Sequence, residues 1–109
     1  MPKTCSIDGL QRLRDKHPEG MVAIITMKGC APCGPAKRSL KKAVGKKAAI
    51  VEIPAEDAAC DKLLSKLHVD SSPVVFWMKG SKTKRISADG KSDEDVAKEV
   101  QALIGAGKK

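Results

Sequence analysis

Two cysteines separated by two residues, Cys30 and Cys33, carry the chemistry that this sequence offers most clearly. They follow an apolar, β-branched run at 21–25, which predicts a strand buried on both faces. After them, apolar residues recur at helical spacing and predict an amphipathic helix: Ala36, Leu40, Ala43 and Val44. The thiols therefore fall where a buried strand turns into a helix. Pro32 suits the first helical turn, because no intrahelical partner is needed there for its missing N–H.

This placement predicts different roles for the two thiols. The first amides of a helix lack intrahelical partners and that end is partly positive, so it stabilises an anion such as a thiolate. We expect Cys30 to lie at the tip of the helix, with Lys28 adding a positive charge, and Cys33 to be shielded one turn deeper. Cys30 would then attack a substrate disulfide, and Cys33 would resolve the mixed disulfide. Ala31 and Pro32, the residues between the thiols, complete the predicted catalytic segment.

The length and composition limit the remaining interpretations. A chain of 109 residues with 41% hydrophobic residues predicts one domain, 1–109, and its formal net charge of +8 favours acidic partners. The amino terminus lacks an apolar leader, and no stretch approaches the ~18 apolar residues of a spanning helix. We therefore expect a cytoplasmic monomer with no membrane association. In a reducing compartment, four cysteines indicate catalysis or metal binding before a structural disulfide framework.

Helices and strands are predicted to alternate along the chain. Ser6 would cap a first helix that ends near 17–20, and Ser92 would cap the last one. Between them we expect a strand at 48–53, a helix between 56 and 68, a central strand at 74–78, a hairpin turn at 79–82, and an edge strand at 83–87. A basic, frayed tail would follow at 105–109. This order predicts an α/β fold with a central mixed β-sheet and helices on both faces.

Over nearly its whole length the chain resembles the thioredoxin family. The resemblance rests on Cys30-Ala31-Pro32-Cys33 after a buried strand, Ser72-Pro73 before a strand, and Lys79-Gly80 at a hairpin turn. It implies a thioredoxin-like fold and a protein-disulfide oxidoreductase, most readily a disulfide reductant in electron transport and cell redox homeostasis. The implied redox centre is the Cys30–Cys33 disulfide itself, with no further cofactor.

The same resemblance implies how substrates and electrons reach the thiols. In that family a cis-proline faces the C-x-x-C segment, and Pro73 occupies its place here. The backbone of Ser72 would then pair with an extended protein substrate, and Gly29 would lie in the substrate-binding surface. The implied partners are disulfide-containing proteins and a thioredoxin-reductase-like or glutathione-based electron donor.

Three residues depart from the family pattern. Gly29 stands where thioredoxins have a tryptophan, and Ile24 stands where they have an aspartate that helps to move the proton of the second thiol. Pro35 follows Cys33 by two residues, which predicts a kinked or loosened first turn of the helix. Because these changes affect the redox potential, a glutaredoxin-like or isomerase-like role remains an alternative.

Metal binding is a competing interpretation of the C-x-x-C pair. Two thiolates could form half of a zinc or iron–sulfur site completed by Cys5, Cys60, His17 or His68. The sequence has no second C-x-x-C and no H-x₃-H motif to support it, so we expect no metal, although a glutathione-bridged cluster across a dimer would need only one cysteine per chain. For Cys60 we expect core packing, for Cys5 an inert thiol, and for both histidines positions at helix ends.

A basic stripe offers a second interpretation of function. It comprises Lys37, Arg38, Lys41, Lys42, Lys46 and Lys47, and the hairpin adds Lys79, Lys82, Lys84 and Arg85. Such a stripe is either a solvated helix face or a surface that docks an acidic protein, even in a redox-inactive module. Nucleic acid is disfavoured, because Phe76 and Trp77 are the only aromatic residues on which bases could stack.

Overall fold

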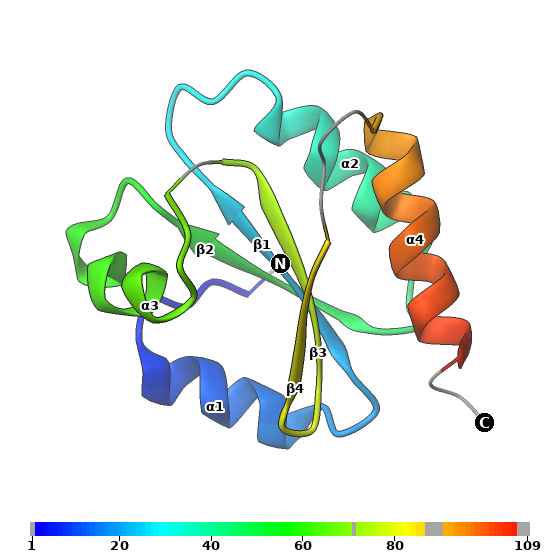
Figure 1. The fold of residues 1–109 in the computed structure, drawn as a ribbon, viewed down its shortest axis with the longest axis horizontal. Helices are drawn as coiled ribbons and strands as arrows, with labels where there is room; N and C mark the ends of the chain where they lie inside the picture. The colour runs from blue at the N-terminus through cyan, green and yellow to red at the C-terminus, as the bar shows by residue number, and fades with distance from the viewer. Residues whose placement is uncertain (1, 71, 87–90, 107–109) are drawn as a thin grey trace.

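Four strands form one mixed sheet between two helical layers (Figure 1). The computed structural model describes residues 2–70, 72–86 and 91–106. Its strands are β1 (Met21–Thr26), β2 (Ala49–Pro54), β3 (Val74–Lys79) and β4 (Lys82–Ile86), in the order β2-β1-β3-β4. Its helices are α1 (Ile7–Lys16), α2 (Cys33–Val44), a 3-10 turn η1 (Ala58–Cys60), α3 (Asp61–Lys66) and α4 (Asp93–Ala106). The α/β fold with a central mixed sheet and helices on both faces is confirmed.

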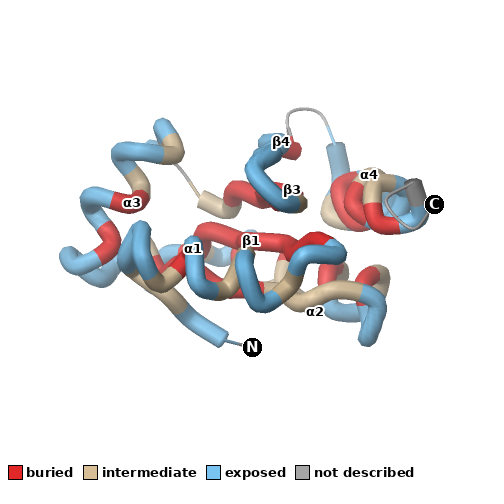
Figure 2. Tube along the Cα trace, turned by 90° about the horizontal axis from the view of Figure 1, so that it is seen from below, coloured by how far each residue is buried: buried red, intermediate tan, exposed pale blue. Residues whose placement is uncertain are grey.

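The central strand β1 separates two hydrophobic cores. It runs parallel to β2 and antiparallel to β3, and all six of its residues are buried (Figure 2). Because successive side chains of a strand point to opposite faces, Met21, Ala23 and Ile25 pack toward α1 and α3. Val22 and Ile24 pack toward α2 and α4. The predicted strand buried on both faces is therefore confirmed.

Gly20 sets the entry to β1 through a close backbone approach. Its φ is +116°, a conformation that residues with a side chain rarely adopt. A Cβ at this position would also overlap the indole ring of Trp77, which lies in β3. The indole ring of Trp77 thus packs directly against the backbone of Gly20, in the space that a side chain at position 20 would need.

The predicted helix caps are confirmed, and each predicted strand forms with its limits shifted by at most one residue, so that Lys79 and Lys82 of the expected turn belong to β3 and β4. The Ser6 hydroxyl accepts a hydrogen bond from the Gly9 N–H at 2.8 Å and caps α1. The Ser92 hydroxyl accepts one from the Asp95 N–H at 3.2 Å at the start of α4. The frayed tail is wrong for Gly105 and Ala106, which continue α4, while its last three residues and Ser87 lie outside the described ranges.

The helix predicted between 56 and 68 is wrong in its limits. Instead, the Asp57 side chain accepts from the Ala59 N–H and opens a 3-10 turn, and α3 is only six residues long. Its end is closed by His68, whose φ is +58°, with the Val69 N–H donating to the Leu64 carbonyl at 3.0 Å. This left-handed ending is a Schellman-type cap, normally made by glycine, so the sequence carried no ordinary stop signal there.

None of the helices within the described ranges is long and apolar enough to cross a membrane.

Candidate active site

Cys30 and Cys33 form a disulfide at the carboxyl end of the central strand. Their Cα atoms lie 5.4 Å apart, within the ordinary range for a disulfide. Cys33 is the first residue of α2 and only 4% exposed, whereas Cys30, in the preceding turn, is partly exposed. Cys30 is therefore the more accessible residue of the pair, and Cys33 is covered.

α2 begins at Cys33, so Cys33 is the first helical residue and does not lie one turn deeper in the helix as predicted, while Cys30 lies before the helix. Pro32 is the N-cap residue, not a member of the first helical turn, and the Cys33 N–H donates to the Cys30 carbonyl at 3.3 Å. The kink predicted at Pro35 is wrong, because α2 is continuous from Cys33 to Val44. Pro35 is its third residue, and the first four N–H groups of a helix have no intrahelical partner. No helical hydrogen bond is lost there.

The Ser72–Pro73 peptide is cis and lies at the same end of the sheet as the thiols. β3 runs antiparallel to β1 and begins at Val74, which pairs with Ile25 near the end of β1. Pro73 also shares a cavity of about 20 Å³ with Ala36 of α2, one turn after Cys33. Ser72 and Pro73 are therefore brought to the C-x-x-C end, as the resemblance implies, and both are partly exposed.

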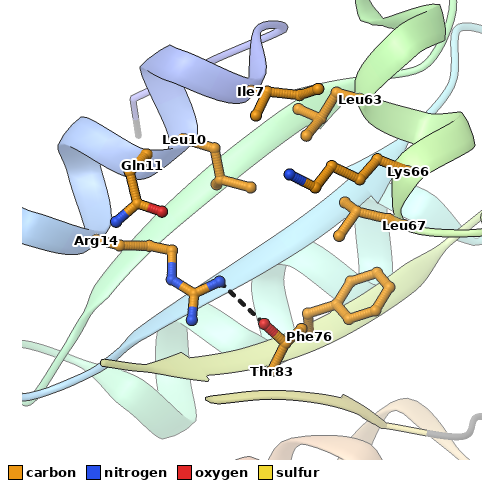
Figure 3. A pocket seen from close by; sticks show the side chains of 9 residues that line it. All are labelled: Ile7, Leu10, Gln11, Arg14, Leu63, Lys66, Leu67, Phe76 and Thr83. Atoms are coloured by element: carbon orange, nitrogen blue, oxygen red, sulfur yellow. Dashed lines mark hydrogen bonds between the residues drawn. The ribbon is translucent and has the colours of Figure 1, made fainter. Parts of the chain in front are cut away.

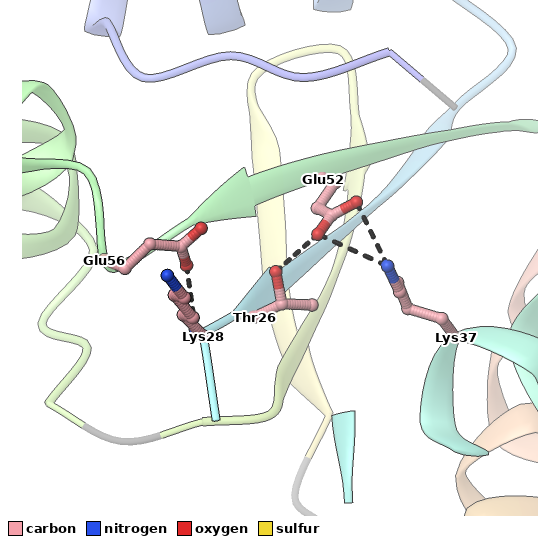
Figure 4. A network of polar contacts seen from close by, with 5 residues as sticks. All are labelled: Thr26, Lys28, Lys37, Glu52 and Glu56. Atoms are coloured by element: carbon pink, nitrogen blue, oxygen red, sulfur yellow. Dashed lines mark hydrogen bonds and ion pairs between the residues drawn. The ribbon is translucent and has the colours of Figure 1, made fainter. Parts of the chain in front are cut away.

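The remaining predicted site residues form the exposed rim of the disulfide. Lys28, Gly29, Ala31 and Pro32 are all exposed. Gly29 has a φ of +80°, and a Cβ there would meet nothing within 4 Å. The Lys28 N–H donates to a carboxylate oxygen of Glu56 at 3.0 Å (Figure 4). Glu56, an anion beside this loop, was not predicted from the sequence.

A buried acid below α2 was also missed. Glu52, in β2, is 7% exposed, and Thr26 is its only companion among the buried polar residues of the described ranges. The Thr26 hydroxyl donates to one carboxylate oxygen at 2.6 Å, and the Lys37 ammonium lies 3.4 Å from the other (Figure 4). Lys37 is one helical turn beyond Cys33 and shares its face of α2. The sequence signal was a single charge inside an otherwise apolar strand, 49–54.

The Glu52 carboxylate stays ionised because of its partners. Burial opposes ionisation, but the hydrogen bond from Thr26 and the charge of Lys37 outweigh it, so the pKa of Glu52 lies below its ordinary value of 4.5. In the sheet Glu52 pairs with Ile24, the position where the family pattern has an aspartate. The buried carboxylate of Glu52 thus lies on β2, next to the position on β1 where the family pattern has an aspartate.

Cys5 and Cys60 form a second disulfide, and the expectation of two free thiols is wrong. Cys60 is completely buried in η1, as predicted, and Cys5 precedes α1. The bond joins segments 55 residues apart, a non-local pairing that the sequence pattern does not reveal. It also removes both cysteines from the metal site considered above. In the described ranges no three His, Cys, Asp or Glu side chains gather as metal ligands.

The basic stripe is exposed except at one residue, and its last two members, Lys46 and Lys47, lie after the end of α2 at Val44. Lys37 is partly buried by its ion pair with Glu52, so its place on the solvated face is corrected. The other five residues of the stripe are exposed: Arg38, Lys41, Lys42, Lys46 and Lys47. His17 is the C-cap of α1, as predicted, and His68 follows the end of α3.

Comparison with solved structures identifies the fold. Mitochondrial thioredoxin 3 from Saccharomyces cerevisiae, in its oxidised form, matches with a TM-score of 0.77 and 15% identity over 94% of this chain and 95% of that one. Thioredoxin O2 from Arabidopsis thaliana matches with a TM-score of 0.75 and 16% identity over 94% and 93%. The J-Trx1 fragment of ERdj5 matches with a TM-score of 0.72 and 14% identity, over 95% of this chain but only 51% of that one.

No protein-family model matches the sequence, and neither does any curated protein. The strand order β2-β1-β3-β4, the cis Ser72–Pro73 peptide before β3 and the disulfide between β1 and α2 are observed in this chain's own structure, and the matches extend over nearly its whole length. The chain is therefore a thioredoxin-fold protein with a C-x-x-C disulfide.

Proposed function

We propose that this protein is a thiol–disulfide oxidoreductase that reduces disulfides in protein substrates. The observation that carries the proposal is the unequal exposure of the Cys30–Cys33 disulfide at the start of α2. A more accessible cysteine joined to a covered one suits a pair in which one thiol attacks and the other resolves. The positive end of α2 favours the thiolate in the reduced form.

The proposed reaction transfers two electrons to the substrate. The Cys30 thiolate attacks one sulfur of the substrate disulfide, a mixed disulfide forms, and the other substrate sulfur leaves as a thiolate that takes up a proton. The Cys33 thiol loses its proton and attacks the Cys30 sulfur, which releases the second substrate thiolate and closes the Cys30–Cys33 disulfide. An external reductant must then reduce this disulfide for the next cycle, either a dithiol of the thioredoxin-reductase type or two molecules of a monothiol such as glutathione.

The surface around the disulfide supports an extended protein substrate. Ser72 and Pro73 lie at the start of β3 beside the thiols, where the backbone of Ser72 would pair with the substrate chain. Met27, in the loop after β1, is 48% exposed and offers an apolar contact. Gly29 leaves space beside Cys30 for a substrate side chain. A glutaredoxin-like or isomerase-like role would use the same groups, and the redox potential of the Cys30–Cys33 pair decides between these roles and that of a disulfide reductant.

The charge of α2 favours acidic substrates. Arg38, Lys41 and Lys42 are exposed on the helix that begins at Cys33. Such a basic face raises the rate at which acidic proteins meet the site, and salt screens this effect. The basic face, which the sequence suggested as a docking surface for an acidic protein, would thus help to select acidic substrates.

Replacing the resolving cysteine tests the proposal. The Cys33→Ser variant should accumulate mixed disulfides between Cys30 and substrate proteins, because the attack that releases the substrate is removed. Acid quenching, alkylation and mass spectrometry of the covalent adducts measure this accumulation.

The matched control is the Cys30→Ser/Cys33→Ser double variant, which should form no adduct. Adducts that are absent from Cys33→Ser, or equally abundant in the double variant, would refute the proposed exchange.

A further inference from the structure

A cavity lies on the α1 and α3 side of the sheet, opposite to the layer formed by α2 and α4. It has a volume of about 300 Å³ and lies between α1, α3 and the β3–β4 hairpin (Figure 3). This volume is at the lower end of the ~300–1,000 Å³ that small-molecule sites occupy. Its walls belong to the α1 and α3 side of the sheet, whereas Cys33 begins α2 on the other side. The cavity is thus separate from the C-x-x-C disulfide.

The walls of the cavity are apolar with two cations and no carboxylate. Five apolar side chains contribute to it: Ile7, Leu10, Leu63, Leu67 and Phe76. Arg14 and Lys66 enter from α1 and α3, with Gln11 and Thr83 completing the nine residues (Figure 3). Ile7 is 38% exposed, one of two large apolar side chains that are exposed in the described ranges. Apolar walls with positive charge are complementary to a ligand that has a hydrocarbon body and an anionic end.

The two cations differ in how they are held. Arg14 donates to the Gly80 carbonyl at 2.6 Å, to the Lys82 carbonyl at 2.9 Å and to the Thr83 hydroxyl at 2.9 Å. These neutral acceptors fix the guanidinium without cancelling its charge. Lys66 extends from α3 across the cavity toward α1 (Figure 3), and with the described residues it makes no hydrogen bond or ion pair. The Lys66 ammonium is thus available to donate a hydrogen bond to a ligand, and the nearby charge of Arg14 makes the electrostatic potential of the cavity more positive.

The Cys5–Cys60 disulfide links the segments that lead into α1 and α3, the two helices that line the cavity. Cys5 lies two residues before α1, and Cys60 lies directly before α3. Arg14 fastens the other end of α1 to the hairpin. The cavity therefore exists between elements that are tied to one another before any ligand arrives, and preorganisation of this kind lowers the entropic cost of binding.

We propose that this cavity binds a small carboxylate with a medium-length hydrocarbon chain, with Lys66 pairing with the carboxylate. The chain lies against Ile7 and Leu67, the apolar lining side chains that are not buried, and Arg14 adds to the attraction without giving up its own hydrogen bonds. This site is independent of disulfide exchange and is an additional binding function of the fold.

A titration with octanoate tests the proposal. Two-dimensional NMR of the labelled protein should show shift changes at α1, α3 and the β3–β4 hairpin. Lys66→Met keeps the bulk of the side chain and removes its charge, and it should weaken octanoate binding about tenfold, the value of one charge-assisted hydrogen bond. Lys62→Met is the matched control, because Lys62 is exposed on the same helix and does not line the cavity.

Two further probes separate the alternatives. Octanol and octylamine should bind more weakly than octanoate, because neither carries the anion that pairs with Lys66. The proposal would be overturned if octanol bound as tightly as octanoate, or if Lys66→Met and Lys62→Met weakened octanoate binding equally. It would also be overturned if the shift changes lay elsewhere on the protein, or if octanoate did not bind below its micelle-forming concentration. Lys66→Met should leave disulfide exchange unchanged, so failure here is distinguishable from failure of the proposed oxidoreductase.

Discussion

Replacing Cys30 with serine is expected to lower the rate of catalysed disulfide reduction by about a thousandfold or more, the scale on which loss of a covalent nucleophile acts. A serine hydroxyl cannot form the mixed disulfide, and Cys33, at 4% exposure, is covered. The measurement is dithiol-driven reduction of a protein disulfide, followed with and without each variant. Residual activity should equal the rate of the driving dithiol alone.

The matched control removes the other two cysteines. Cys5 and Cys60 belong to the α1 and α3 side of the sheet, so the Cys5→Ser/Cys60→Ser variant keeps the Cys30–Cys33 pair intact. It should retain most of the activity at a temperature where it is folded. The redox centre would instead be the Cys5–Cys60 disulfide if activity survived the loss of Cys30 but required Cys5 and Cys60.

Replacing Glu52 with glutamine is expected to lower the free energy of unfolding by about 2 kcal/mol at pH 7, the scale of a hydrogen bond to a charged group. The variant keeps the shape of the side chain but loses the ion pair with Lys37 and weakens the acceptor for the Thr26 hydroxyl. Urea denaturation measures the difference. Glu56→Gln is the matched control, because Glu56 is exposed, and its replacement should cost less than about 0.5 kcal/mol.

The pH dependence of this difference has a definite sign. The pKa of Glu52 in the folded protein lies below its ordinary value of 4.5, so the folded state releases the proton more readily than the unfolded state does. The contribution of Glu52 is therefore complete above pH 4.5 and is lost as the pH falls through the folded-state pKa. The wild type and Glu52→Gln should converge in stability on acidification. A difference that stayed constant or widened below pH 4.5 would contradict the assignment.

Elements with strong local signals could be predicted from the sequence. β1 and β3 are uninterrupted apolar runs, and Ser6 and Ser92 are hydroxyl residues at the starts of amphipathic helices, so burial and capping are determined by residues close in the chain. The C-x-x-C pair was found for the same reason: its strand and its helix are adjacent in sequence. The shape of the fold around the thiols follows from these segments.

Features that depend on distant residues could not be predicted. The Cys5–Cys60 disulfide and the ion pair between Lys37 and Glu52 join segments that meet only after the sheet has formed. Lys37 looked like one charge of an exposed stripe, because nothing near it in sequence shows that β2 places a carboxylate below it. α3 ended early because His68 adopts the left-handed conformation that usually requires glycine.

An equilibrium redox titration of Cys30 and Cys33 in graded thiol/disulfide buffers, with alkylation and mass spectrometry of the two residues, tests whether they form one redox-active pair. We expect both cysteines to change together between a dithiol and an intramolecular disulfide, with a reducing midpoint suited to a disulfide reductant. A more oxidising midpoint would favour the isomerase-like alternative. Independent alkylation of the two thiols, with no intramolecular disulfide at any buffer ratio, would show that Cys30 and Cys33 do not form a redox-active pair.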